Sequence, residues 1–209
     1  NYSTTRKVTL TEMINHSKSV RMGVKKSLMV VDMPYKTYET KALALKNAKK
    51  IMKQTKCDAV KLEGGKKIIK QVQFLIKNKI PVLGHLGLLP QTVKGKFKSK
   101  GKTTREIRQL MSDALLLQKT GVFAVVLECV KTPITKQITK NLNIPTIGIG
   151  SSVHCDGQVL VTDDILGLNE TKIKFVKKFS NVKKYISLGI KKFALDVRSK
   201  KYPSKKHSY

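Results

Sequence analysis

The chain has 209 residues, a length that suits one compact domain, and its 40% hydrophobic content is typical of a globular protein rather than a disordered one. The absence of a run of about eighteen apolar residues argues against a transmembrane helix. The cysteines Cys57, Cys129 and Cys155 fit neither a disulfide framework nor a zinc site, which favours a reducing, cytoplasmic location. We therefore expect a single domain over residues 1–209.

The net charge of +30 raises the alternative of a nucleic-acid-binding protein. Only five of the 43 basic residues are arginine, however, and arginine is the residue that reads phosphates and bases bidentately. Many lysines also recur at the spacing of a solvent-exposed helix face, as Lys46, Lys49, Lys50 and Lys53 do. We interpret the charge as a general enrichment in lysine, and we do not expect a nucleic-acid partner.

Helix and strand patterns alternate along the chain. The pair Thr9 and Glu12 has the spacing of a capping box and predicts a helix from there to about Met22. Further helices are expected at about 41–54, 66–77, 104–119, in the segment opened by Pro133, and at 172–198. Short apolar strands are expected at 27–31, 59–62, 81–84, 123–127, 145–149 and 158–161, with a basic loop at 94–102.

This alternation predicts βαβ units and a parallel sheet. An open doubly wound sheet would carry a glycine-rich phosphate loop after its first strand, and none is present. A closed (β/α)8 barrel is favoured because polar side chains end nearly every strand, and in a barrel such ends converge on one face. Those residues are Asp32, Glu63, His85, Glu128 and Ser151. We predict a (β/α)8 barrel of which about six strands lie in this chain.

Lys61 and Glu63 are two residues apart on one strand, so they share a face. That face is the barrel interior if Val60 and Leu62 pack outward against helices. A buried ion pair between Lys61 and Glu63 is the alternative, although it would be costly without further partners. The neighbouring pair of glycines, 64 and 65, suggests close approach of a ligand.

The other candidates each have a structural alternative. Asp32 could cap the turn that follows its strand, His85 could be a hydrogen-bonded core histidine, and Glu128 could cap the next helix. Asp32 and Glu63 offer the oxygen ligands that Mg²⁺ prefers, and Glu128 ends an otherwise apolar strand as a candidate general base. Together these residues suit deprotonation next to a metal-chelated carbonyl, because the metal would stabilise the enolate.

Five motifs in this order resemble the ketopantoate hydroxymethyltransferase family. The likeness extends over almost the whole chain, to the terminal YPSKKHSY. The motifs are VVDMPY (30–35), AVKLEGG (59–65), GHLGLLPQT (84–92), FAVVLECV (123–130), and IPTIGIG followed by CDGQVLV (144–161).

The resemblance implies a (β/α)8 barrel of the phosphoenolpyruvate/pyruvate group that transfers a hydroxymethyl group from 5,10-methylenetetrahydrofolate to 3-methyl-2-oxobutanoate. It implies Mg²⁺ as the cofactor, and commonly a ring-like homodecamer. It also implies the site residues: Asp32 for metal and keto acid, Glu63 for metal, Lys61 for substrate and Glu128 as proton acceptor, with His85 and Ser151 lining the site.

By the same resemblance, the family's first two strands, with an Asp-Ser pair that contributes to the site, would precede Asn1. We therefore expect the 209-residue chain alone to be inactive. Two alternatives on the same scaffold are a basic nucleic-acid-binding protein and a non-catalytic assembly protein.

Overall fold

A computed structural model describes residues 4–93, 98–170 and 173–209 of the chain. Residues 94–97 of the expected basic loop lie outside the described residues. The chain divides into two compact units, Asn1–Val159 and Leu160–Tyr209. The expectation of a single domain stays a prediction.

The first unit is built on one parallel sheet of six strands, as predicted. Neighbouring strands in the chain are also neighbours in the sheet, in the order β1-β2-β3-β4-β5-β6. The strands are β1 (Val30–Asp32), β2 (Ala59–Glu63), β3 (Val82–Gly87), β4 (Ala124–Glu128), β5 (Thr146–Ile149) and β6 (Gly157–Gln158). Every pair is parallel, so all strand ends that carry the candidate residues lie along one edge.

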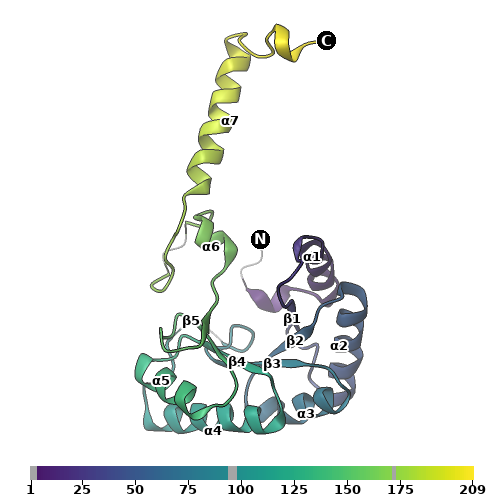
Figure 1. Cartoon of the computed structure of the whole chain (residues 1–209), viewed down its shortest axis with the longest axis vertical. Coiled ribbons are helices and arrows are strands. Elements are labelled where there is room, and N and C mark those ends of the chain that lie inside the picture. Colours follow the sequence, from purple (N-terminus) through teal and green to yellow (C-terminus); the bar gives the residue numbers. More distant parts are fainter. Residues whose placement is uncertain (1–3, 94–97, 171–172) are drawn as a thin grey trace. The chain divides into compact units, whose positions relative to one another are not determined.

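Helices connect these strands and cover one side of the sheet. Figure 1 shows α2, α3, α4 and α5 as an outer row that follows the curve of the strands. The helices of this unit are α1 (Leu10–Gly23), α2 (Lys41–Thr55), α3 (Ile69–Lys77), α4 (Thr104–Thr120) and α5 (Thr132–Asn141), with short 3-10 turns η1 (Thr5–Lys7) and η2 (Lys66–Ile68). This is the arrangement of consecutive βα units.

The predicted capping box at the start of α1 is confirmed. The Thr9 hydroxyl accepts a hydrogen bond from the Glu12 amide at 3.2 Å, and the Glu12 carboxylate accepts one from the Thr9 amide at 2.8 Å. Two amide groups that the first helical turn leaves without partners are thereby satisfied.

Several element boundaries differ from the sequence-based prediction. β3 runs to Gly87 rather than residue 84, so His85 lies inside the strand and not after it, and α3 begins at Ile69 rather than residue 66. β1 begins at Val30 rather than residue 27, because its pairing with β2 begins at Val30, and Leu28 is 62% exposed. β6 covers only residues 157–158. In the second unit α7 begins at Val182 rather than residue 172, after Asn181, whose side chain accepts from the Lys184 amide.

The core lies on both faces of the sheet. Val60 and Leu62 are fully buried in the large cluster that the helices complete, as the alternation of β2 predicted. A smaller apolar cluster, centred on Leu83, Ala124 and Val126, lies on the opposite, inner face. The inner face therefore has an apolar floor, and the candidate residues stand at its edge.

The second unit contains α6 (Thr162–Leu166), α7 (Val182–Arg198) and the turn η3 (Lys205–His207). No residue of α7 is buried. Among the described residues, no helix combines the length and the apolar character needed to cross a membrane.

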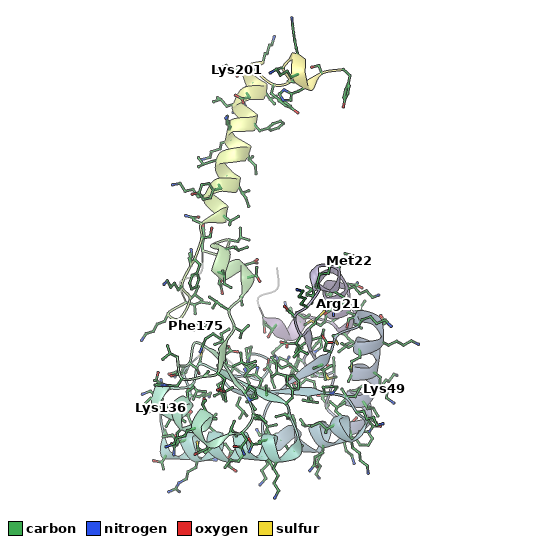
Figure 2. All side chains as sticks on the ribbon, viewed as in Figure 1. Arg21, Met22, Lys49, Lys136, Phe175 and Lys201 are labelled. Carbon is green, nitrogen blue, oxygen red and sulfur yellow. The ribbon has the colours of Figure 1, made fainter. Side chains whose placement is uncertain are left out.

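Lysine side chains project from the outer helices. Lys46, Lys49, Lys50 and Lys53 of α2 are all exposed, as their spacing predicted. Figure 2 shows Lys49, and Lys136 of α5, pointing away from the sheet.

Candidate active site

The register of the sheet places the predicted carboxylates and cations on one face. Asp32 is aligned with Lys61, Glu63 with His85, and Gly87 with Glu128. Aligned residues of parallel strands point to the same face. Four consecutive strands, β1 to β4, therefore deliver these side chains to one edge of the inner face.

Lys61 forms its ion pair with Asp32, on the neighbouring strand, and not with Glu63. The Lys61 Nζ lies 2.7 Å from Asp32 Oδ2. Lys61 is largely enclosed, whereas the Asp32 side chain is 44% exposed. Asp32 thus faces open space with one oxygen fixed by a cation, and the structure shows no bond from it to the turn at residues 33–37.

Glu63 is a buried carboxylate with a raised pKa. It is 5% exposed, and burial is the main cause of the raised pKa, with the negative charge of Asp32 as a smaller cause in the same direction. The charges of His85 and Lys61 oppose the shift, as does the Gln91 amide, which donates to Glu63 Oε2 at 3.0 Å. Any bound cation would favour the ionised form of such a carboxyl.

Gln91 links the loop after β3 to the loop after β1 and to Glu63 at the end of β2, and it is not among the residues predicted from the sequence. Its side-chain Nε2 donates to the Met33 carbonyl at 2.9 Å, and its Oε1 accepts from the Tyr38 hydroxyl at 2.8 Å. Gln91 and Tyr38 are both buried. Burial and the nearby charges of Glu63 and Asp32 raise the pKa of Tyr38, so its hydroxyl keeps the proton that it donates.

His85 lies between the two carboxylates Glu63 and Glu128. It is 2% exposed, its Nε2 is 3.2 Å from Glu128 Oε2, and this contact becomes an ion pair when the ring carries a second proton. Within the described part of the chain, neither ring nitrogen has an aligned hydrogen-bond partner. His85 thus contacts Glu128 closely without an aligned hydrogen bond, and its role in lining the site stays a prediction.

The backbone of Glu128 is fixed against the end of β3. The Leu88 amide donates to the Glu128 carbonyl at 2.8 Å, next to Gly87, whose φ is +96°. A Cβ on Gly87 would lie 2.2 Å from that carbonyl oxygen. The following helix, α5, has no side-chain cap, so Glu128 does not cap it.

Ser151 uses its hydroxyl for a structural contact. Its Oγ accepts from the Val130 amide at 3.0 Å and lies 3.2 Å from the Val130 carbonyl. These bonds tie the loop after β5 to the loop after β4. A further role in lining the site stays a prediction.

The glycine at position 65 is explained by a protein side chain rather than by a ligand. A Cβ there would lie 2.1 Å from Cγ of Asp113, whose Oδ1 accepts from the Lys66 amide at 2.9 Å. The predicted close approach thus occurs, but the group that approaches is Asp113 from α4.

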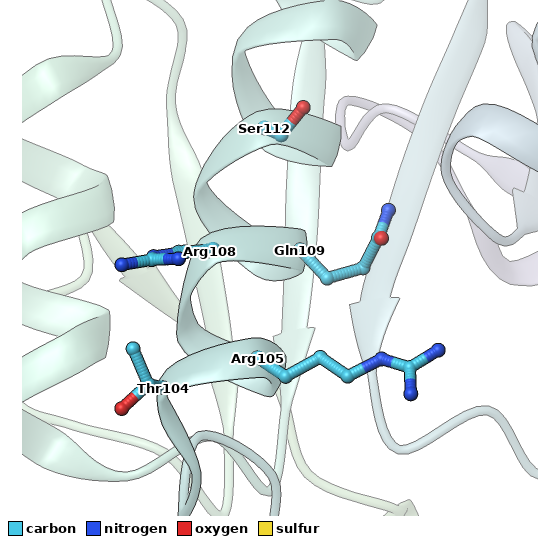
Figure 3. A pocket seen from close by; sticks show the side chains of 5 residues that line it. All are labelled: Thr104, Arg105, Arg108, Gln109 and Ser112. Carbon is cyan, nitrogen blue, oxygen red and sulfur yellow. The ribbon is translucent and has the colours of Figure 1, made fainter.

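A cavity of about 970 Å³ adjoins Glu63 and lies among the loops after β1, β2 and β3. Of the predicted site residues, Glu63 alone lines it, so the cavity is not where the candidate groups converge. A pocket of about 550 Å³ lies on α4. Figure 3 shows Arg105 and Gln109 on one side of this helix and Thr104 and Arg108 on the other, with none of the predicted site residues.

The residues present fit a magnesium ion as far as the donor set goes. Asp32 and Glu63 are two carboxylates on adjacent strands of the same face. The described residues contain no group of three or more His, Cys, Asp or Glu side chains that could hold a metal. Mg²⁺ usually takes one or two carboxylates and completes its shell with water and substrate oxygens, so two suffice.

Comparisons with known proteins show the family of the chain. The family model for ketopantoate hydroxymethyltransferase matches residues 1–205. A 3-methyl-2-oxobutanoate hydroxymethyltransferase of Pelagibacter ubique is 61% identical over 208 residues, which is 100% of this chain and 80% of that protein. The protein of the same name from Rhizobium etli is 46% identical over 99% of this chain and 77% of its own length.

Among solved structures, 2,3-dimethylmalate lyase of the PEP mutase/isocitrate lyase superfamily has a TM-score of 0.55. It covers 97% of this chain and 69% of its own at 9% identity, so the likeness concerns the fold alone. The predicted barrel class, with six parallel strands curled beneath their helices, is confirmed. On the family match and the 61% identity, the chain belongs to the ketopantoate hydroxymethyltransferase family.

Proposed function

We propose that this protein transfers a hydroxymethyl group from 5,10-methylenetetrahydrofolate to 3-methyl-2-oxobutanoate and so forms 2-dehydropantoate. The observation that carries the proposal is the convergence of Asp32, Lys61, Glu63 and Glu128 at one edge of the inner face. The relatives that bear this activity in their name match the whole chain.

In this proposal Asp32 and Glu63 hold Mg²⁺, and a bound Mg²⁺ supplies stabilisation for the negative charge that develops on the keto oxygen. Asp32 is exposed enough to contact the substrate as well. Lys61 is held at 2.7 Å from Asp32 and presents its positive charge to the carboxylate of the keto acid.

Glu128 is the proposed base. Its carboxylate takes the proton from C3 of the keto acid, and the electron pair moves onto the keto oxygen to give the enolate. C3 then attacks the methylene carbon of the folate as the first of its two bonds to nitrogen breaks. The second carbon–nitrogen bond breaks as water adds its oxygen to that carbon, and the two nitrogens of tetrahydrofolate take up the proton removed from C3 and one proton of the water. His85, at 3.2 Å, is placed to hold the Glu128 carboxylate in position.

A Glu128→Gln substitution, made in the chain extended by the family's upstream segment, tests the proposed base without the folate. In D₂O with Mg²⁺, NMR follows the exchange of the C3 proton of 3-methyl-2-oxobutanoate for deuterium. We expect the exchange rate to fall by about 10²- to 10⁴-fold, the usual contribution of a general base, with keto acid binding retained.

Glu12→Gln is the matched control, because Glu12 lies in the first turn of α1 and lines neither described cavity, and a glutamine there can still form the capping box, so the exchange rate should be unchanged. Exchange at the unsubstituted rate in the Glu128→Gln protein would exclude Glu128 as the base. The cytoplasmic location, the homodecamer and the absence of a nucleic-acid partner stay predictions of the family resemblance and the composition.

A further inference from the structure

The loop after β3 holds a buried amide network directly behind Glu63. Gln91 is 6% exposed and Tyr38 is 8% exposed, and neither belongs to the proposed catalytic set. The network joins the loops after β1 and β3 and the end of β2, through the side chain and the backbone amide of Gln91. Burying a glutamine side chain costs free energy unless its amide has hydrogen-bond partners. The partners of Gln91 therefore indicate what the buried side chain does.

The orientation of the Gln91 amide is determined by its partners. The Met33 carbonyl can only accept, so the atom that faces it at 2.9 Å has to be Nε2. Oε1 then faces Tyr38, whose hydroxyl donates at 2.8 Å. Both ends of the side chain are thereby fixed to the loop after β1.

Fixing the side chain also fixes the backbone of Gln91. Its amide N–H donates to Glu63 Oε2 at 3.0 Å. That bond takes one Glu63 oxygen and sets the direction of the carboxylate, and Oε1 accepts no hydrogen bond from the described residues. Partners of this kind around metal ligands orient the ligand and typically change metal affinity by about 10- to 100-fold when they are removed.

We propose that Gln91 is a positioning residue that holds the Glu63 carboxylate in the orientation required for metal binding. The inference rests on the proposed metal role of Glu63. Tyr38 supports the hydrogen bond between the Gln91 amide and Glu63 indirectly, because its hydroxyl fixes Oε1 of Gln91.

The test is a metal titration that does not depend on turnover. Mn²⁺ serves as the probe, its binding is followed by electron paramagnetic resonance with saturating 3-methyl-2-oxobutanoate, and circular dichroism melting checks the fold. Gln91→Met keeps the backbone N–H and most of the volume but loses both amide bonds. We expect it to weaken Mn²⁺ binding by about tenfold, and Tyr38→Phe by about threefold, the effect of one lost hydrogen bond.

Gln71→Ala is the matched control. Gln71 also donates its Nε2 to a backbone carbonyl of the loop after β1, that of Glu39 at 2.9 Å, but it has no contact with Glu63. Its loss should leave Mn²⁺ binding unchanged. If Gln91→Met does not fold, Mn²⁺ binding by Tyr38→Phe decides the test: weaker binding supports the positioning role, and unchanged binding overturns it.

Glu63→Gln separates the proposed metal role of Glu63 from the proposed positioning role of Gln91. Weak Mn²⁺ binding in Glu63→Gln but unchanged binding in Gln91→Met and Tyr38→Phe would overturn the positioning role and keep the metal site. Unchanged Mn²⁺ binding in Glu63→Gln would overturn the metal role of Glu63 and the inference with it.

Discussion

Glu63 combines a buried position with a charge that function requires. Burial is the main cause of its raised pKa. A carboxyl whose pKa is raised in the folded state contributes stability that is present below the unfolded pKa and is lost as the pH rises through the folded pKa. At pH values above the unfolded pKa, the cost of ionising the buried Glu63 therefore lowers the stability of the metal-free protein.

Because a charge on the buried Glu63 costs stability, we predict that Glu63→Gln raises the melting temperature of the metal-free protein at neutral pH. The neutral amide keeps the shape and an oxygen that can accept from Gln91. The melting temperature is expected to rise because the amide carries no charge that burial would penalise. Scanning calorimetry with a chelator present measures it, and a lower melting temperature would contradict the prediction.

The pKa of Glu106 is shifted in the opposite direction from the pKa of Glu63. The Lys102 amide, which donates to its carboxylate at 2.9 Å, lowers the pKa of Glu106. Its stabilising effect is therefore present above the unfolded pKa and lost as the pH falls through the folded pKa. Glu106→Gln should lower the melting temperature at neutral pH.

The site residues were predictable to unequal degrees. Asp32, Glu63 and Glu128 could be found because each ends a short apolar run, and the two-residue period of a strand assigns the face. Gln91 could not be found in this way, because it lies in a loop and its importance comes from contacts with Met33 and Tyr38 more than fifty residues away.

At the scale of elements, the junction between β3 and β4 is a tight backbone contact near the site. Gly87→Ala would force a positive φ on alanine and place its Cβ 2.2 Å from the Glu128 carbonyl oxygen. We predict a loss of at least about 3 kcal/mol in the free energy of unfolding, in the upper range for single substitutions. Urea denaturation measures the loss.

Gly121→Ala is the control that separates the cost of a positive φ from the cost of steric overlap with a neighbouring residue. Gly121 has a φ of +98°, nearly that of Gly87, but a Cβ there would meet only Ile76 atoms at 3.6 Å and beyond. Its substitution should cost about 1 kcal/mol, the effect of strain alone. Equal losses at the two positions would show that the overlap with Glu128 is relieved by local movement.

Element boundaries were predictable where the signal is local. The start of α1 follows from Thr9 and Glu12, which satisfy each other within one turn. The start of α7 was placed too early because the apolar residues before it were given more weight than Asn181, a good N-cap. The start of β1 depends on where β2 begins to pair, and no local pattern contains that information.

At the scale of the whole molecule, the net charge of +30 is a source of repulsion. In the described part of the chain few cations lie within 4 Å of a carboxylate; the lysines and arginines that do are Arg21, Lys61, Lys100 and Lys183. Salt therefore has few attractive pairs to weaken and much repulsion to screen.

We predict that the melting temperature rises as NaCl is increased from about 0.01 M to about 0.3 M, over which the screening length falls from about 30 Å to below 10 Å. Calorimetry at constant pH checks this, and a zwitterionic osmolyte at equal osmolarity provides the control. A melting temperature that falls with NaCl would show that attractive pairs dominate.

The sequential strand order has a consequence for how the chain is made. Each strand of the sheet needs only the strand synthesised just before it as a hydrogen-bonding partner. On the ribosome, β2 can pair with β1 while β3 is still being translated, and every later strand can be added in the same way. Assembly in the direction of translation shortens the time for which an unpaired apolar strand is exposed to other nascent chains.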